Sequence, residues 1–134
     1  MIFEKLKSIE KTIEGTEYFT NGVAHYFSVD KLDITDSLQL AIKQHLIQMK
    51  AIDPTENVTL TLIDNPQNDI KTLCDEWHFD KSVIAGILSI VDGTTKVYKC
   101  CEDFEYIAIG NVGDIFRILV TKQEIVFLEF YIVD

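Results

Sequence analysis

The side chains that could act as nucleophiles are three cysteines, and those that could act as bases for them are three histidines. These residues are Cys74, Cys100, Cys101, His25, His45 and His78. A thiolate enzyme needs a thiol of lowered pKa beside a base that a third group orients. The spacing indicates no such arrangement, because Cys74 falls on the apolar side of a predicted helix and His45 shares a helix face with Ile42 and Met49. We therefore expect that the protein is not an enzyme and has no catalytic residues.

Metal and phosphate sites are not indicated either. The sequence has no second cysteine pair and no histidine cluster at zinc-ligand spacing, so we expect no metal ion and no cofactor. Two glycines, Gly110 and Gly113, stand close together but lack the phosphate-loop pattern and its neighbouring lysine. These glycines predict a tight turn.

The composition is strongly acidic. The chain has 134 residues, with 12 Lys and Arg against 22 Asp and Glu, and a formal net charge of −10. Proteins that bind the phosphate backbone of nucleic acids need clustered basic side chains, so we expect no direct contact with nucleic acid. An acidic surface instead favours a basic protein partner through electrostatic steering.

Two short segments combine acidic and aromatic residues. The first runs from Asp75 to Asp80 and holds the only tryptophan, and the second runs from Glu102 to Tyr106. Aromatic anchors ringed by charge are typical of protein interfaces. The candidate partner-binding residues are Asp75, Glu76, Trp77, His78, Asp80, Glu102, Asp103 and Glu105. The alternative interpretation is that Trp77 ends a helix by packing into the core and that the acids are merely solvated, so Trp77 would be an anchor only if exposed.

Three helices are predicted from apolar residues at helical spacing. The first covers residues 2–13 and ends at Gly15, and the second covers residues 38–49 after capping residues Thr35 and Asp36. The third is capped by Asn68 and ends near Trp77. Residues 82–91 fit both a helix and a buried strand, and we favour the strand because of their β-branched content and the Asp-Gly pair that follows.

The rest of the chain predicts strands. Residues 18–20 and 23–29 form a hairpin around Asn21-Gly22, and alternation predicts a strand over residues 58–63. Further strands are predicted at residues 95–100, 106–109, 115–121 and 125–133. The last is apolar on both faces, which indicates either a central strand or an edge paired with another chain, and we favour the central position. The expected fold is one α+β domain over residues 1–134, a mostly antiparallel sheet with about three helices packed on one face.

One stretch of the C-terminal third resembles a known family. The run Tyr106–Gly110, followed by Gly113–Ile118, resembles the late strand-turn-strand of the SMI1/KNR4-like (SUKH) domains, with an Ile-Gly strand end and a Gly-Asp turn. The family's Leu-Pro step before a tyrosine-bearing helix, and its Asn-Gly-Gly-like turn, have no match here. The resemblance implies a bacterial immunity protein that binds and neutralises a toxin, often a nuclease. The matched positions are structural, so no functional residue of the family carries over.

The leading hypothesis is an acidic cytoplasmic protein that neutralises a basic partner, most concretely an immunity protein that occludes a toxin nuclease domain. The cytoplasmic expectation rests on an N-terminus without the apolar core of a signal peptide and on the absence of a membrane-spanning stretch. One alternative is a phage-type inhibitor that mimics nucleic acid, which requires acids spaced like phosphates. The other is an oligomeric structural or assembly subunit built on the last strand or on the face of Leu40 and Ile47. The partner's identity and the oligomeric state stay open.

Overall fold

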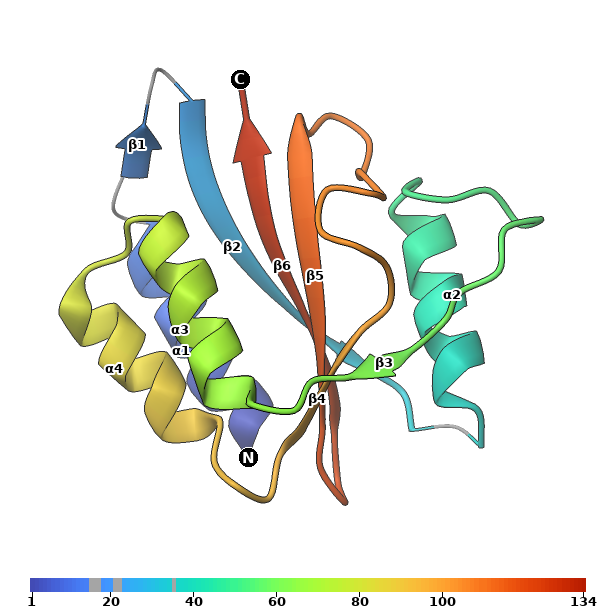
Figure 1. The fold of residues 1–134 in the computed structure, drawn as a ribbon, viewed down its shortest axis with the longest axis horizontal. Helices are drawn as coiled ribbons and strands as arrows, with labels where there is room; N and C mark the ends of the chain where they lie inside the picture. The colour runs from blue at the N-terminus through green and yellow to red at the C-terminus, as the bar shows by residue number, and fades with distance from the viewer. Residues whose placement is uncertain (15–17, 21–22, 35) are drawn as a thin grey trace.

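The computed structural model describes residues 1–14, 18–20, 23–34 and 36–134. The elements, in chain order, are α1 (Ile2–Glu14), β1 (Tyr18–Thr20), β2 (Val23–Leu32), α2 (Leu38–Gln48), β3 (Thr61–Leu62), α3 (Pro66–Glu76), α4 (Lys81–Ile90), β4 (Lys96–Lys99), β5 (Gly113–Val120) and β6 (Ile125–Val133). The helices pack against a single twisted sheet (Figure 1). The predicted α+β class with an antiparallel sheet is therefore confirmed.

The sheet has the strand order β1-β2-β6-β5-β4-β3, and the neighbouring strands are all antiparallel. The C-terminal strand β6 lies in its middle and pairs with β2 on one side and β5 on the other. Ser28 of β2 and Phe116 of β5 both lie opposite Glu129 of β6. The central position predicted for residues 125–133 is confirmed, and it explains why this strand is apolar on both faces.

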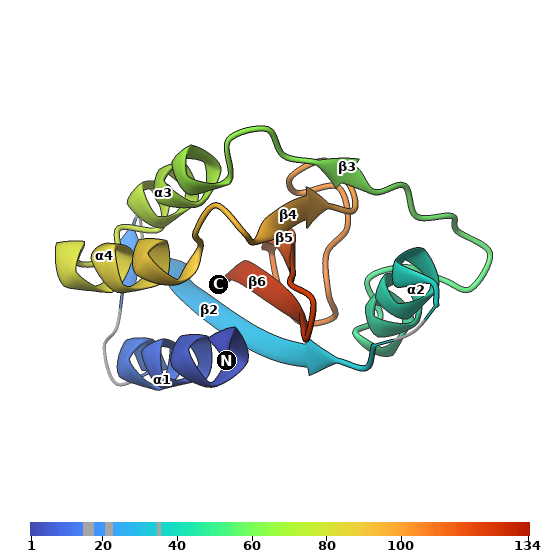
Figure 2. The same ribbon diagram turned by 90° about the horizontal axis from the view of Figure 1, so that it is seen from below.

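Helices cover both faces of the sheet. Figure 2 shows α1, α3 and α4 on one side and α2 alone on the other. Alternate residues of β6 serve the two sides, since Leu128 and Phe130 pack under the three helices whereas Ile125 and Phe127 pack under α2. The sequence predicts about three helices on one face, and three lie there, but the predicted helix at residues 38–49 covers the opposite face.

The strand predicted at residues 82–91 is wrong, because this segment is the helix α4. Its buried residues are Val83, Ile84, Ile87 and Ile90, which recur at helical spacing. Gly86 allows α1 to approach, since a Cβ at this position would lie 3.3 Å from Cδ1 of Ile9. The β-branched content that favoured a strand is outweighed by burial of one helical face between neighbouring helices.

Two predicted helix caps are displaced by a few residues. Asn65, not Asn68, caps α3 by accepting a hydrogen bond from the Asn68 amide, and Pro66 follows at the first turn. Ser37 caps α2, so Asp36 does not; Thr35 lies outside the described residues. The predicted end at Gly15 and the predicted turn at residues 21–22 also lie outside them, although β1 and β2 pair as the predicted hairpin requires.

Two sets of polar contacts join α1 to the sheet. Lys7 donates a hydrogen bond of 3.1 Å to the carbonyl oxygen of Val29 in β2. The short strand β1 pairs only with residues 23–25 of β2 and does not reach Val29. Glu124, in the β5–β6 turn, accepts hydrogen bonds from the amides of Ile2 and Phe3 and so caps the first turn of α1. At the edge of the sheet opposite β1, the strand predicted over residues 58–63 is shorter than expected. Only Thr61–Leu62 forms the strand β3.

Candidate functional site

The first predicted acidic segment lies where α3 turns into α4. Trp77 ends α3, and His78 adopts a positive φ of 60° that reverses the chain toward α4. The side chains of Asp75, Glu76 and His78 are exposed at this turn, as is that of Asp80. Most of the first candidate set is therefore accessible to a partner.

Trp77 is the exception, because its side chain is only 2% exposed. Its indole Nε1 donates to the carbonyl oxygens of Tyr26 at 3.1 Å and Tyr131 at 3.3 Å. The ring also packs edge-on against Phe130, with 5.8 Å between the ring centroids. The condition for Trp77 to be an exposed anchor is not met, and its role is to end α3 against the sheet.

The second acidic segment belongs to the loop of residues 100–112 between β4 and β5, which we call the β4–β5 loop. Its aromatic residue Phe104 has a positive φ of 66° and is 48% exposed. This ring stacks on Trp77, with 6.3 Å between the centroids and 17° between the planes. The two segments predicted separately are therefore neighbours, and Phe104, which the candidate set omits, is the aromatic residue that reaches the surface.

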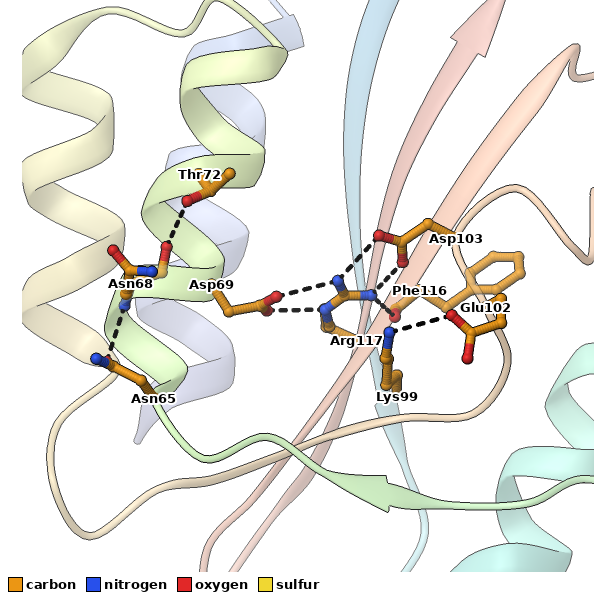
Figure 3. A network of polar contacts seen from close by, with 9 residues as sticks. All are labelled: Asn65, Asn68, Asp69, Thr72, Lys99, Glu102, Asp103, Phe116 and Arg117. Carbon is orange, nitrogen blue, oxygen red and sulfur yellow. Dashed lines mark hydrogen bonds and ion pairs between the residues drawn. The ribbon is translucent and has the colours of Figure 1, made fainter.

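A buried arginine also joins these elements. Arg117 of β5 is 2% exposed and points toward α3, where its Nε donates to Oδ2 of Asp69 at 2.8 Å and its Nη2 to Oδ1 at 3.1 Å. Its Nη1 donates to Oδ1 of Asp103 at 2.8 Å and to the carbonyl oxygen of Phe116 at 2.9 Å. Figure 3 shows the two carboxylates approaching the guanidinium from α3 and from the β4–β5 loop. One cation thus fixes the loop against the helix.

The ionisation of this cluster is settled by its geometry. Burial acts to lower the pKa of the Arg117 guanidinium, but the hydrogen bonds and charges of Asp69 and Asp103 outweigh burial and raise the pKa. Arg117 therefore stays charged. Asp103, a candidate contact residue, is engaged in this cluster, although 36% of its side chain remains exposed.

Two further candidate acids have nearby lysines. Asp75 accepts from Lys71 at 2.8 Å across one helical turn, and Glu102 lies 3.5 Å from the ammonium of Lys99. Both pairs are largely in solvent, where such ion pairs contribute little free energy. Glu105 accepts a hydrogen bond from the Glu102 amide at 2.9 Å, which shapes the start of the loop. A stronger basic partner could compete for these carboxylates at low cost.

The strand predicted at residues 106–109 is wrong, since the chain there is part of the β4–β5 loop. The carboxylate of Asp114 accepts a hydrogen bond of 2.7 Å from the Ala108 amide, which a neighbouring strand would otherwise have to satisfy. Gly110 then turns the chain with a φ of 89°. The loop consequently exposes several apolar side chains beside its acids. They are Phe104, Ile107, Ile109 and Val112.

A pair of buried carboxyl groups holds the base of the loop. Glu129 of β6 and Asp114 share a side-chain hydrogen bond, and Nδ2 of Asn111 donates to both. Burial, followed by the hydrogen bond and charge of Asp114, raises the pKa of Glu129 to about 9. Burial likewise raises the pKa of Asp114. The pair therefore keeps a proton at neutral pH, and this proton allows one carboxyl group to donate to the other.

Of the potential catalytic side chains, Cys74 and His45 lie on opposite faces of the sheet. Burial raises the pKa of Cys74 to about 12, so this thiol is inert at neutral pH. His45 lies 3.3 Å from Asp30 and stacks edge-on against Phe127 on the α2 side of the sheet. Within the described part of the chain, no three His, Cys, Asp or Glu residues are grouped in a way that could hold a metal ion. Helices that are long and apolar enough to cross a bilayer are likewise absent from that part.

Comparisons with known proteins support the fold alone. No family model matches the chain, and no curated protein matches it either. Among solved structures, the crystal structure of citrus MAF1 is similar in fold, with a TM-score of 0.54 over 99% of each chain. The identity is 8%, so this likeness covers the whole arrangement of helices and strands but extends to no site. The resemblance of residues 106–118 to SUKH domains stays a prediction.

Proposed function

We propose that this chain is an acidic binding protein that neutralises a basic protein partner. The most concrete form is an immunity protein that occludes a bacterial toxin nuclease domain. The observation that carries the proposal is the contact between Trp77 and Phe104, which brings the two acidic segments together. We call the exposed residues of these segments the acidic surface; its members are Asp75, Glu76, His78, Asp80, Glu102, Asp103, Phe104 and Glu105.

The physical properties of the acidic surface support this role. Nucleases that bind phosphate carry basic surfaces, and opposite charges accelerate the encounter of two proteins. The exposed apolar side chains of the β4–β5 loop, such as Ile109 at 70% exposure, provide area that gains free energy when a partner covers it. Trp77 holds Phe104 in place from below and takes no direct part in the contact.

The supporting framework is rigid enough for occlusion. The β4–β5 loop is tied to α3 through Arg117 and to the sheet through Asp114 and Asn111. A loop fixed in this way loses little conformational entropy on binding, which favours affinity. The proposal places the protein in the cytoplasm, where a toxin nuclease would reach its substrate.

The test first identifies the proteins encoded beside this chain and uses a basic protein found among them as the partner. Binding is measured by calorimetry and stopped-flow fluorescence at increasing salt, and inhibition is measured on the partner's nuclease activity. The triple variant Asp75→Asn, Glu76→Gln, Glu105→Gln should slow association by about tenfold or more. A matched control removes the same charge elsewhere through Glu4→Gln, Glu14→Gln and Asp33→Asn, and it should associate nearly as fast as the wild type.

Two results would contradict the proposal. One is that a neighbouring basic protein shows no salt-sensitive binding to this chain. The other is that the site variant and the control variant weaken binding equally, which would mean that net charge alone governs association and that the acidic surface has no special role.

A further inference from the structure

The strand β3 forms one edge of the sheet and is open on its outer side. Among the residues that the structure describes, β3 is last in the strand order and pairs only with β4. Figure 2 shows it at the margin of the sheet, between α3 and α2. The side chain of Thr61 is exposed, and Leu62 is 52% exposed. An open strand edge of this kind can pair with a strand of another chain.

The sequence of this edge has none of the features that keep sheet edges apart. Residues 58–63 read Val-Thr-Leu-Thr-Leu-Ile and contain no charged residue, no proline and no glycine. Soluble proteins usually protect an edge with a lysine, a proline or a bulge. The β2 edge has such protection, since Lys7 donates to the carbonyl oxygen of Val29. The β3 edge is therefore the better candidate for pairing.

The hydrogen bonds to β4 determine which backbone groups of β3 face outward. The Ile63 amide donates to the Val97 carbonyl oxygen at 2.9 Å, so these two residues occupy a hydrogen-bonded position. Such positions alternate with non-hydrogen-bonded ones along antiparallel strands. The backbone groups of Thr61 therefore face β4, whereas the amide and carbonyl of Leu62 face away from the sheet. Continuing the alternation places those of Leu60 on the same outer side.

We propose that β3 is the interface for a second copy of this chain, which pairs with it antiparallel about a two-fold axis at Thr61. Leu60 of each copy then lies opposite Leu62 of the other, and their outward amides and carbonyls exchange hydrogen bonds. The two Thr61 side chains meet in a non-hydrogen-bonded pair, where side chains are closest. The run Leu-Thr-Leu reads the same in both directions, so the edge is self-complementary.

A contact of Val58 favours this register over the other symmetric one. A two-fold axis at Leu60 would place Val58 opposite Leu62 and would require its carbonyl oxygen to accept from the second copy. That oxygen already accepts a hydrogen bond from Nε2 of Gln39 in α2. With the axis at Thr61, the pairing is complete without Val58.

The charges near β3 permit the approach of two copies, although each copy carries a net charge of −10. Lys99 pairs with Thr61 across β4, and its ammonium lies 3.5 Å from Glu102, so these two charges offset each other. The two Asp64 residues would lie six residues apart along the paired strands, about 20 Å, which exceeds the Debye length at physiological salt. Glu105 lines the same cavity as Thr61 and stays uncompensated, so added salt should strengthen the pairing.

Pairing at this edge closes after two copies. The two-fold axis uses β3 of both chains, and Lys7 protects the edge at β2. One pair of short strands makes a small interface, so the dimer should be weak and should depend on concentration. This inference does not depend on the proposed basic partner, since it concerns two copies of the chain alone.

The first test measures the mass of the full chain by sedimentation equilibrium from about 1 µM to about 1 mM. The average mass should rise from that of one chain toward that of two, and more steeply at about 0.5 M salt than at about 0.05 M. Leu62→Lys places an ammonium opposite Leu60 of the second copy and should raise the dissociation constant about tenfold or more. Leu40→Lys is the matched control, because Leu40 is also 52% exposed but lies on α2.

The second test establishes the register by cross-linking in a Cys101→Ser background, which removes the partly exposed native thiol. Thr61→Cys should form a disulfide between copies under mild oxidation, because the two side chains face each other. Thr59→Cys is the control, since in this register Thr59 lies opposite Ile63 and four residues from its counterpart. Mass spectrometry locates the bridge, and circular dichroism verifies the fold of each variant.

Four results would overturn the proposal. The wild type could stay monomeric up to about 1 mM, or Leu40→Lys could weaken association as much as Leu62→Lys. Thr59→Cys could cross-link as fast as Thr61→Cys. The mass could also grow past that of two chains, which would mean that the contact is not closed by a two-fold axis.

Discussion

The ring of Phe104 lies nearly parallel to the indole of Trp77, with 17° between the planes, and it covers Trp77 from the solvent side of the β4–β5 loop. Phe104 reaches this position through a left-handed backbone conformation, which its amide stabilises by donating to the Asp114 carbonyl oxygen at 3.0 Å. The stacking joins two segments that are distant in sequence. The stacking therefore contributes, together with the Arg117 cluster, to the conformation of the acidic surface.

Gly113→Ala should displace Phe104 without changing any charge. A Cβ at Gly113 would lie 3.0 Å from Cε1 and 3.1 Å from Cδ1 of the Phe104 ring, so the ring must move. We expect a loss of about 1 kcal/mol in the free energy of unfolding and a weaker near-ultraviolet dichroism band from Trp77. Gly93→Ala is the control, because a Cβ there meets no atom within 4 Å. An unchanged Trp77 band in Gly113→Ala would contradict the packing described for Phe104.

Arg117→Ala should destabilise the protein strongly. The substitution removes the buried guanidinium and leaves the partly exposed carboxylates of Asp69 and Asp103 without their shared cation. We expect a loss of about 3 kcal/mol in urea unfolding. Asp103→Asn keeps the two hydrogen bonds between Arg117 and Asp69 and should lose only about 1 kcal/mol. Equal losses in the two variants would show that the cluster contributes no more than a single surface ion pair.

Glu129→Gln should flatten the pH dependence of stability. The native state holds the Glu129 proton up to a pKa of about 9, whereas the unfolded chain releases it near the ordinary value of 4.5. Between these values the native state binds more protons, so stability falls as pH rises. The slope due to this group is at most about 1.4 kcal/mol per pH unit. A glutamine amide can donate this hydrogen bond at every pH. Plots of unfolding free energy against pH that run parallel for the wild type and the variant between pH 5 and 9 would refute this account.

Trp77 should report on the core rather than on partner contact. As the only tryptophan, 2% exposed, it should emit at short wavelength and be poorly quenched by iodide in the native state. Trp77→Phe keeps an aromatic ring but loses the hydrogen bonds to Tyr26 and Tyr131, so we expect a loss of about 2 kcal/mol in stability. At temperatures where the Trp77→Phe variant is folded, its affinity for a partner should stay within about threefold of that of the wild type. A far larger loss of affinity would show that Trp77 contacts the partner directly.

The sequence predicts the sheet better than it predicts the loops. Residues 125–133 carry mostly apolar side chains on both faces of the strand. Only a strand that is covered on both sides can bury such side chains, so the central position of this strand could be predicted. Residues 106–109 have similar composition but form no strand, because the Asp114 carboxylate binds the Ala108 amide. The sequence does not show a hydrogen bond of this kind, which depends on tertiary packing.

The exposed acids of the candidate site were predictable, whereas the burial of Trp77 and the exposure of Phe104 were not. The exposure of Asp75 and Glu102 can be expected from their charge. That their two segments lie close together depends on the packing of Trp77 against Phe104, which are distant in sequence. Arg117 carries a signal that the prediction leaves unused. A single cation within the apolar run of residues 115–120 requires carboxylate partners from other elements, and Asp69 and Asp103 supply them.

The central place of β6 determines the order in which this protein can be assembled during synthesis. Residues 23–32 and 113–120 form the two strands that flank β6, and neither can complete its pairing until residues 125–133 have left the ribosome. The nascent chain must therefore carry two open strand edges, the first of them until residues 125–133 are available for pairing. Pairing at such long sequence separation is slow and leaves chains prone to aggregate. Refolding yield should consequently fall with concentration, and nascent chains should bind chaperones through β2.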